Sequence, residues 1–407
     1  MNCQLDTASI FYENSLYRFM YEATGSFVPC WMSHLLAGLA IMLLLVNAVL
    51  LGAALVTWLE RRILGRLHNR IGPNRWGPFG LLQPIADLMK LLTKEDLVPE
   101  GADKLVFTLV PFVMMLPLVL MTAVIPFSYN TMLADLNVGV LFILAVSSVS
   151  TIGIFMAGWS SNNRYALFGA ARSVAVLISY EVPVVVSLLG IVMITGSMSL
   201  NNIVQAQTIP FLLVQPLALF IFVTGMSAEL NRTPFDIAEA ESEIIAGYHT
   251  EYSGIKFALI FATETGAMLV VSAIIATLFL SGWNGPFESF LGWLWFLLKT
   301  LGIIFVFIWV RATYPRLRLD QIMALSWKFL LPLSLINLAI TSIEVFVLKG
   351  ADGYLSTTDL WIMAGINIPL SILLVLLLAG LLNKKVDARP VKVAAPVVPG
   401  VATIEVK

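Results

Sequence analysis

Residues 34–62 read HLLAGLAIMLLLVNAVLLGAALVTWLERR, a long apolar run that ends in a carboxylate and two arginines. A helix needs about 20 apolar residues to cross the hydrocarbon core, where its backbone amides must be satisfied internally. The run starts late in the chain and ends in Trp58-Leu59-Glu60-Arg61-Arg62 rather than in a small-residue cleavage site. We therefore expect a retained membrane span at residues 34–59 and no cleavable signal peptide.

Further apolar runs follow, and the composition agrees with them. The chain of 407 residues is 59% hydrophobic and only 12% charged, whereas an average soluble domain is roughly 25% charged. A soluble globule is excluded. We predict an all-α polytopic membrane protein of about nine transmembrane helices, forming one domain over residues 34–382. The other predicted spans are residues 105–127, 138–158, 174–196, 210–228, 255–280, 290–310, 327–348 and 361–382.

The distribution of positive charge predicts the orientation of these spans. Most of the 24 Lys and Arg residues lie in alternate connections and in the C-terminal tail. Because positive residues in short loops stay in the cytoplasm, we expect the N-terminus outside and the C-terminus inside. The segments are then a periplasmic N-terminal extension (1–33), two cytoplasmic loops (60–104 and 229–254) and a flexible cytoplasmic tail (383–407).

The first cytoplasmic loop contains a predicted amphipathic helix. Gly72-Pro73-Asn74 and Gly77-Pro78 stop any helix that continues from the first span. Beyond them, apolar residues recur at helical spacing, with charged residues on the opposite side (Leu81, Leu82, Ile85, Leu88, Met89 and Leu92 against Asp87, Lys90 and Lys94). Such a helix lies in the membrane interface, either as a surface anchor or, if Asp87 is buried, as the wall of a cavity. Glu60 lies beside Arg61 and Arg62. We expect an ion pair that holds these guanidinium groups in a fixed direction.

The second cytoplasmic loop is acidic. Residues 229–251 read ELNRTPFDIAEAESEIIAGYHTE. On a helix from Pro234, the trio Asp236, Glu239 and Glu243 shares one face, where like charges raise one another's pKa. Such a group holds fractional protons near neutrality. The alternative is a solvated acidic loop.

Two carboxylates lie inside predicted spans. Glu181 and Glu264 each stand a few residues from the cytoplasmic end. A carboxylate at a helix centre costs about 2.5–3.5 kcal/mol to insert, so such residues usually face a polar cavity and mark proton or ion paths. A merely structural, hydrogen-bonded role is the alternative. Glu344 and Lys299 lie toward the outer ends of their spans, where we expect their side chains to reach the interface.

The chain lacks the sequence features of a redox centre. Cys3 and Cys30 do not have the spacing of zinc or iron–sulfur ligands, and no histidine pair suits haem. The net charge of −1 creates no general field for nucleic acid. We predict no metal site, no tightly bound cofactor and no nucleic-acid partner.

The residues quoted above resemble the quinone-chamber membrane subunits of bacterial respiratory complex I, the proton-pumping NADH:quinone oxidoreductase. The resemblance covers roughly residues 35–345 and rests on long strings, which are far more specific than short motifs. The strings are ERRILG (60–65), NRIGPNRWGPFGLLQPIAD (69–87), ELNRTPFD (229–236), EAESE (239–243) and YPR (314–316).

The resemblance implies a multi-pass subunit of the bacterial inner membrane that forms a quinone chamber and takes part in proton translocation. It implies that quinone is the substrate and that flavin and iron–sulfur clusters belong to partner subunits. The partners would be the hydrophilic quinone-reducing subunits and the antiporter-like membrane subunits, in a lipid bilayer. The implied chamber residues are Glu60, Arg61, Arg62, Arg70, Asp87, Arg232, Phe235, Phe261 and Arg311. The implied proton-coupling residues are Glu181, Glu229, Asp236, Glu239, Glu241, Glu243, Glu251 and Glu264.

Two other functions stay open at this point. The membrane anchor of a membrane-bound hydrogenase or formate hydrogenlyase shares this fold and need not bind quinone, but the long string over residues 60–87 favours the quinone enzyme. An independent cation transporter would also explain intramembrane acids. It fits poorly with large charged loops that resemble docking surfaces.

Overall fold

The computed structural model describes residues 17–18, 21–22, 29–128, 132–237, 247–349 and 355–386. The described residues are helical and contain no β-strand. Among them, eight helices are long and apolar enough to cross a membrane, and one apolar helix, α9, is shorter. The prediction of about nine membrane helices is thereby confirmed. The long helices are α2 (Cys30–Leu67), α4 (Lys104–Val124), α5 (Gly139–Ser160), α6 (Arg164–Thr195), α11 (Gly254–Phe279), α12 (Glu288–Thr313), α14 (Leu331–Leu348) and α15 (Thr357–Val386).

Helix α2 continues well past the predicted end of the first span at residue 59. Its 38 residues include the charged turn ERRILGRL, because Glu, Arg and Leu are good helix formers. The helix ends before Asn69, which has a φ of 54°, and the chain then folds back along α2. A Cβ added to Gly72 would lie 3.0 Å from the Cα of Arg62. This close approach requires a glycine.

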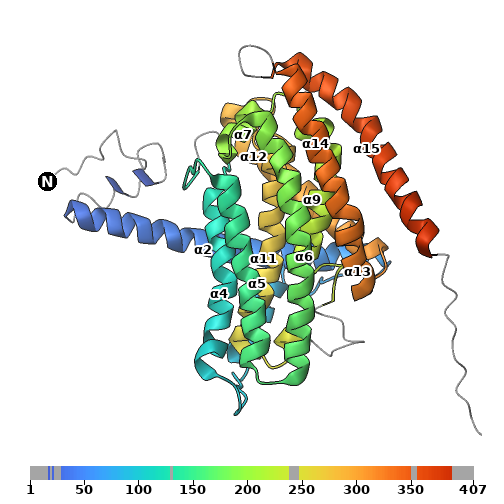
Figure 1. The fold of residues 1–407 in the computed structure, drawn as a ribbon. Helices are drawn as coiled ribbons and strands as arrows, with labels where there is room; N and C mark the ends of the chain where they lie inside the picture. The colour runs from blue at the N-terminus through green and yellow to red at the C-terminus, as the bar shows by residue number, and fades with distance from the viewer. Residues whose placement is uncertain are drawn as a thin grey trace, which may run out of the picture.

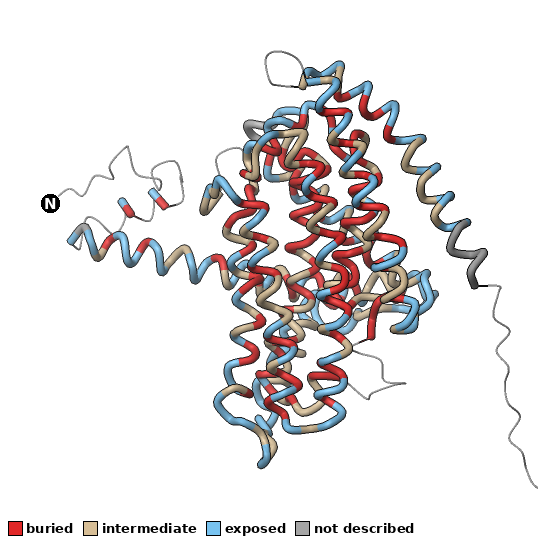
Figure 2. Tube along the Cα trace, viewed as in Figure 1, coloured by how far each residue is buried: buried red, intermediate tan, exposed pale blue. Residues whose placement is uncertain are grey.

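The long helices form a bundle around a large apolar core, with smaller apolar clusters beside it. Helices α4, α5, α6, α11 and α14 run side by side, whereas α2 crosses them steeply and its N-terminal half projects away (Figure 1). Core residues come from α2, α4, α5, α6, α9, α11 and α12. Burial is concentrated inside the bundle, while the projecting part of α2 and much of α15 are exposed (Figure 2). These exposed apolar surfaces suit contact with lipid.

The fifth span is broken. It consists of α8 (Phe211–Val214) and α9 (Pro216–Glu229), after the short helix α7 (Leu200–Ala206). Gln215 between them has φ −131° and ψ 58°, outside the helical region. Pro216 explains the break, because proline disfavours a helical conformation in the residue before it and lacks an amide hydrogen.

Short elements pack against the long helices. They are the 3₁₀ turn η1 (Pro78–Gly80), α3 (Gln83–Thr93), the turn η2 (Gly247–His249), α13 (Leu319–Leu325) and the π-helical segment η3 (Ser326–Leu330). Helix α3 confirms the predicted amphipathic helix, and none of its residues is buried within this chain. The predicted N-terminal extension lies mostly outside the described residues. Of the predicted tail from residue 383, only the end of α15 is described.

Candidate functional site

Glu60 is the centre of a buried ion cluster. The inward face of α2 carries Glu60, which is only 6% exposed. Arg232, from the loop after α9, places Nη1 2.8 Å from Glu60 Oε1, and Arg311, at the end of α12, binds the same oxygen. The carboxylate therefore joins three segments of the chain. Two guanidiniums on one acid leave the cluster with a net positive charge.

A second ion pair attaches α3 to α2. Arg61 Nη1 lies 2.6 Å from Asp87 Oδ2, and Gln83 Nε2 donates to the other carboxylate oxygen at 3.3 Å. Asp87 keeps 26% of its side chain exposed, and Lys90 lies 3.8 Å away. Asp87 therefore does not extend freely into solvent, and its ion pair with Arg61 ties α3 to α2.

The loop after α9 is held by buried contacts. Asp236, which is 5% exposed, accepts from Arg316 Nη2 at 3.0 Å. Phe235 packs edge-on against Tyr180, with ring centroids 5.3 Å apart. These contacts hold the segment that carries Arg232. Asp236 is consequently paired with an arginine, and its predicted partners Glu239 and Glu243 lie outside the described residues, as does Glu241.

Glu264 lies next to the Glu60 cluster. Tyr248 donates its hydroxyl to Glu264 Oε1 at 2.6 Å, and the carboxyl group lies within electrostatic reach of Arg232 and Arg311. One helical turn earlier on α11, Phe261 stacks on Phe257. Glu264 on α11 therefore interacts electrostatically with the arginines that bind Glu60.

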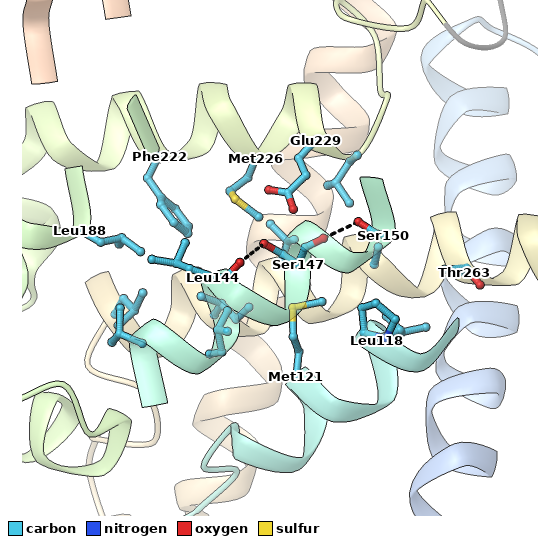
Figure 3. Close-up of a pocket in the computed structure, with 18 of the residues that line it drawn as sticks. Leu118, Met121, Leu144, Ser147, Ser150, Leu188, Phe222, Met226, Glu229 and Thr263 are labelled. Carbon is cyan, nitrogen blue, oxygen red and sulfur yellow. Dashed lines mark hydrogen bonds between the residues drawn. The ribbon is translucent and has the colours of Figure 1, made fainter. Parts of the chain in front are cut away.

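Glu181 and Glu229 form a separate pair of intramembrane acids. Ser148 on α5 donates to Glu181 on α6, and the charge of Glu181 acts on Glu229. Glu229 points toward Ser147 at the rim of a cavity of about 70 Å³ (Figure 3). The lining is apolar apart from one polar end (Ser147, Ser150, Glu229 and Thr263). This end offers oxygen atoms to water or to a proton.

Three of the implied residues lie elsewhere. Arg62 Nη1 donates to the carbonyl of Phe79 at 2.5 Å, and its guanidinium lies over the Phe79 ring. Arg62 and Arg70 line a separate hollow of about 300 Å³, together with Arg66. Glu251 accepts from Asn163 Nδ2 at 2.6 Å, on the turn that precedes α6. The structure does not bring these side chains to Glu60.

Sequence reasoning did not select several partners of these residues. Arg316 was present in the string YPR, so its pairing with a carboxylate could have been considered. Tyr248, Ser148 and Asn163 carry no local signal, because an isolated hydroxyl or amide becomes a partner only through the fold. Among the described residues, no group of three His, Cys, Asp or Glu side chains gathers as metal ligands.

Comparisons with known proteins identify the family of this chain. A model of the NADH dehydrogenase family matches residues 39–342. The H subunit of the NADH-quinone oxidoreductase of Dehalococcoides mccartyi (strain CBDB1) is 55% identical over 344 residues, covering 84% of this chain and 94% of the relative. An H subunit from Geobacter metallireducens is 50% identical, covering 74% of this chain and 94% of the relative. The one from Geobacillus kaustophilus is 48% identical, covering 70% and 86%. The chain therefore belongs to the NADH dehydrogenase family, among the multi-pass inner-membrane H subunits of NADH-quinone oxidoreductase.

Proposed function

We propose that this subunit forms a wall of the chamber in which quinone is reduced, and that its buried acids pass the effect of reduction to proton-moving subunits. The observation that carries the proposal is the buried cluster of Glu60, Arg232 and Arg311. It joins α2, α12 and the loop after α9 at one end of the bundle. Burying charged groups is expensive, and charged groups gathered in this way mark functional sites.

The neighbouring surfaces suit a molecule with a polar head and an apolar tail. The Arg61–Asp87 pair holds α3 against α2, and the apolar residues of α3 stay exposed, including Ile85 and Met89. An isoprenoid tail can lie along such a surface while the quinone head reaches the polar end. The chamber is then completed by a hydrophilic partner subunit that brings the reducing centre.

The same end of the bundle is the cytoplasmic end in this proposal. The segments that meet there are rich in basic residues, among them Arg61, Arg232, Lys256, Arg311 and Arg316. Positive residues are retained on the cytoplasmic side, so the N-terminus lies outside. Two surfaces then face the hydrophilic subunits, which carry the flavin and iron–sulfur clusters. They are the arginine-lined hollow of the first loop and the exposed apolar face of α3.

In this proposal, electrostatic interactions between charged side chains couple quinone reduction to proton transfer. Glu264 shares the field of Arg232 and Arg311, while Glu229 shares that of Glu181. A change of one unit of charge at the quinone shifts the protonation of several coupled acids together. The acids of α6, α9 and α11 are therefore the elements of this chain that respond first, and the antiporter-like membrane subunits would receive the effect.

Photoaffinity labelling of the assembled complex tests the chamber. A photoreactive quinone analogue should label peptides from residues 60–93, and excess quinone should suppress that labelling. The variant Asp87→Asn keeps the shape of the side chain but weakens its hold on Arg61, so labelling of this segment should fall. Labelling confined to the exposed face of α15, without competition by quinone, would contradict the chamber.

A further inference from the structure

A polar cluster crosses the apolar interior at the break in the fifth span. Gln215, the residue at the break, donates from Nε2 to Thr341 Oγ1 at 2.8 Å. Asn337 Nδ2 donates to Gln215 Oε1 at 3.1 Å. Both partners lie on α14, and all three residues are buried. The cluster therefore ties α14 to the broken helix with hydrogen bonds in surroundings that exclude water.

Asn367 extends this cluster to α15. Its Nδ2 donates to the carbonyl of Val214 at 3.0 Å and to Glu344 Oε2 at 2.9 Å. The break at Gln215 leaves the Val214 carbonyl available, and Asn367 satisfies it. The amide thus uses both of its hydrogens, one on a backbone oxygen and one on a carboxyl group.

Glu344 is an acid whose second oxygen has no hydrogen-bond partner among the described residues. The side chain is 8% exposed, so the expectation that it reaches the interface is wrong. The oxygen without a partner in the described part of the chain is Oε1. One neutral amide is therefore the only hydrogen-bond donor that the carboxyl group has in the described structure.

Within the described ranges, no cation faces this acid from the elements packed around it. Helix α14 packs on α6, α9, α15 and η3. Along α14 the nearest charged residue is Lys349, which is exposed, and α15 offers Asp359, whose carboxylate is bonded to Ser356. The other charged residues of these elements lie toward the opposite end of α14 (Lys328 of η3, Glu229 of α9, Arg164, Arg172 and Glu181 of α6, and Lys384 and Lys385 in the last turn of α15). An ionised Glu344 would have no counter-charge among the described residues.

The energetic comparison favours a neutral acid. An ion that is buried without a partner of opposite charge is strongly destabilised even after the structure relaxes. A neutral carboxylic acid that lacks one hydrogen-bond partner costs much less. Glu344 therefore avoids the larger cost by holding a proton on Oε1, with Oε2 as the carbonyl oxygen that accepts from Asn367.

We propose that Glu344 is a proton-binding site, formed where the broken fifth span, α14 and α15 meet. Ser326, at the other end of the continuous helical segment that leads to Glu344, donates to the carbonyl of Ser179, close to Glu181. A helical rise of 1.5 Å per residue separates the levels of Ser326 and Glu344 by about 27 Å. The site is therefore remote from the acids of the proposed coupling path.

Infrared difference spectroscopy on the assembled complex tests this site. Spectra taken at neutral and at alkaline pH show the C=O stretch of a protonated carboxyl group separately from carboxylate bands. Glu344→Gln should remove one such band from the neutral spectrum. The matched control, Asp359→Asn, removes a carboxylate that is hydrogen-bonded to Ser356 and should leave that band unchanged.

A second variant keeps the test valid if Glu344→Gln fails to assemble. Asn367→Ala retains the acid but removes its hydrogen bond, so the band should move to higher frequency without disappearing. A neutral spectrum that is identical in wild type and Glu344→Gln would overturn the proposal. A band that appears only when sodium is replaced by a large organic cation would also overturn it, because the ligand would then be a metal ion.

Discussion

Removing the carboxylate of Glu60 should disrupt the site more than removing any single arginine around it. In Glu60→Ala, Arg232 and Arg311 face one another with side chains that are only 12% and 27% exposed. Breaking a buried pair costs about 3–5 kcal/mol, because an uncompensated charge remains. Since Arg311 keeps some contact with solvent, we take the lower value of about 3 kcal/mol.

The loss should appear in quinone reduction and not in electron entry. A destabilisation of about 3 kcal/mol lowers the ratio of intact to disrupted sites about a hundredfold. NADH:quinone reductase activity should fall by up to that factor, while NADH:ferricyanide reduction, which does not need the chamber, should persist. A native gel measures the amount of assembled complex, to which both rates are normalised.

Two further variants separate charge from shape. Glu60→Gln keeps the size and a hydrogen-bond acceptor, so it should lose less activity than Glu60→Ala. Combining Glu60→Ala with Arg311→Leu removes the repulsion between guanidiniums, so the double variant should recover part of the loss. Full quinone reductase activity in assembled Glu60→Ala would refute the reasoning, and so would losses that simply add in the double variant.

Other substitutions test the remaining features. Glu181→Gln removes the charge that acts on Glu229, so proton pumping per NADH should decrease in proteoliposomes; unchanged pumping would mean that Glu181 is structural. Gly72→Ala places a methyl group 3.0 Å from Arg62 Cα and should destabilise the subunit by about 1–3 kcal/mol. This loss should appear as a lower dissociation temperature on native gels. The control Gly38→Ala, with no atom within 4 Å of the added Cβ, should leave the dissociation temperature unchanged. Lys256→Met breaks a 2.9 Å pair with Asp96 and should increase proteolysis of the loop before α4; an unchanged cleavage pattern would contradict this role.

The sequence by itself determined the class of fold. Apolar runs longer than a bilayer crossing, the Gly/Pro turn after residue 71 and the apolar spacing of α3 are local properties, and local backbone and hydration energies decide them. The structure confirmed the number of membrane helices and the amphipathic helix. Helix ends were less predictable: α2 continues to Leu67 because its charged turn keeps good helix formers.

Only the tertiary structure decided which side chains meet. Glu60 is separated from Arg232 by 172 positions and from Arg311 by 251, and no local pattern specifies that pairing. The same reason explains the wrong expectation for Glu344: its position near a helix end suggested contact with the interface, but α15 covers it and Asn367 binds it. Hydropathy measures how much each segment avoids water, whereas the partner of a buried charge depends on helix packing, which brings together residues remote in the chain.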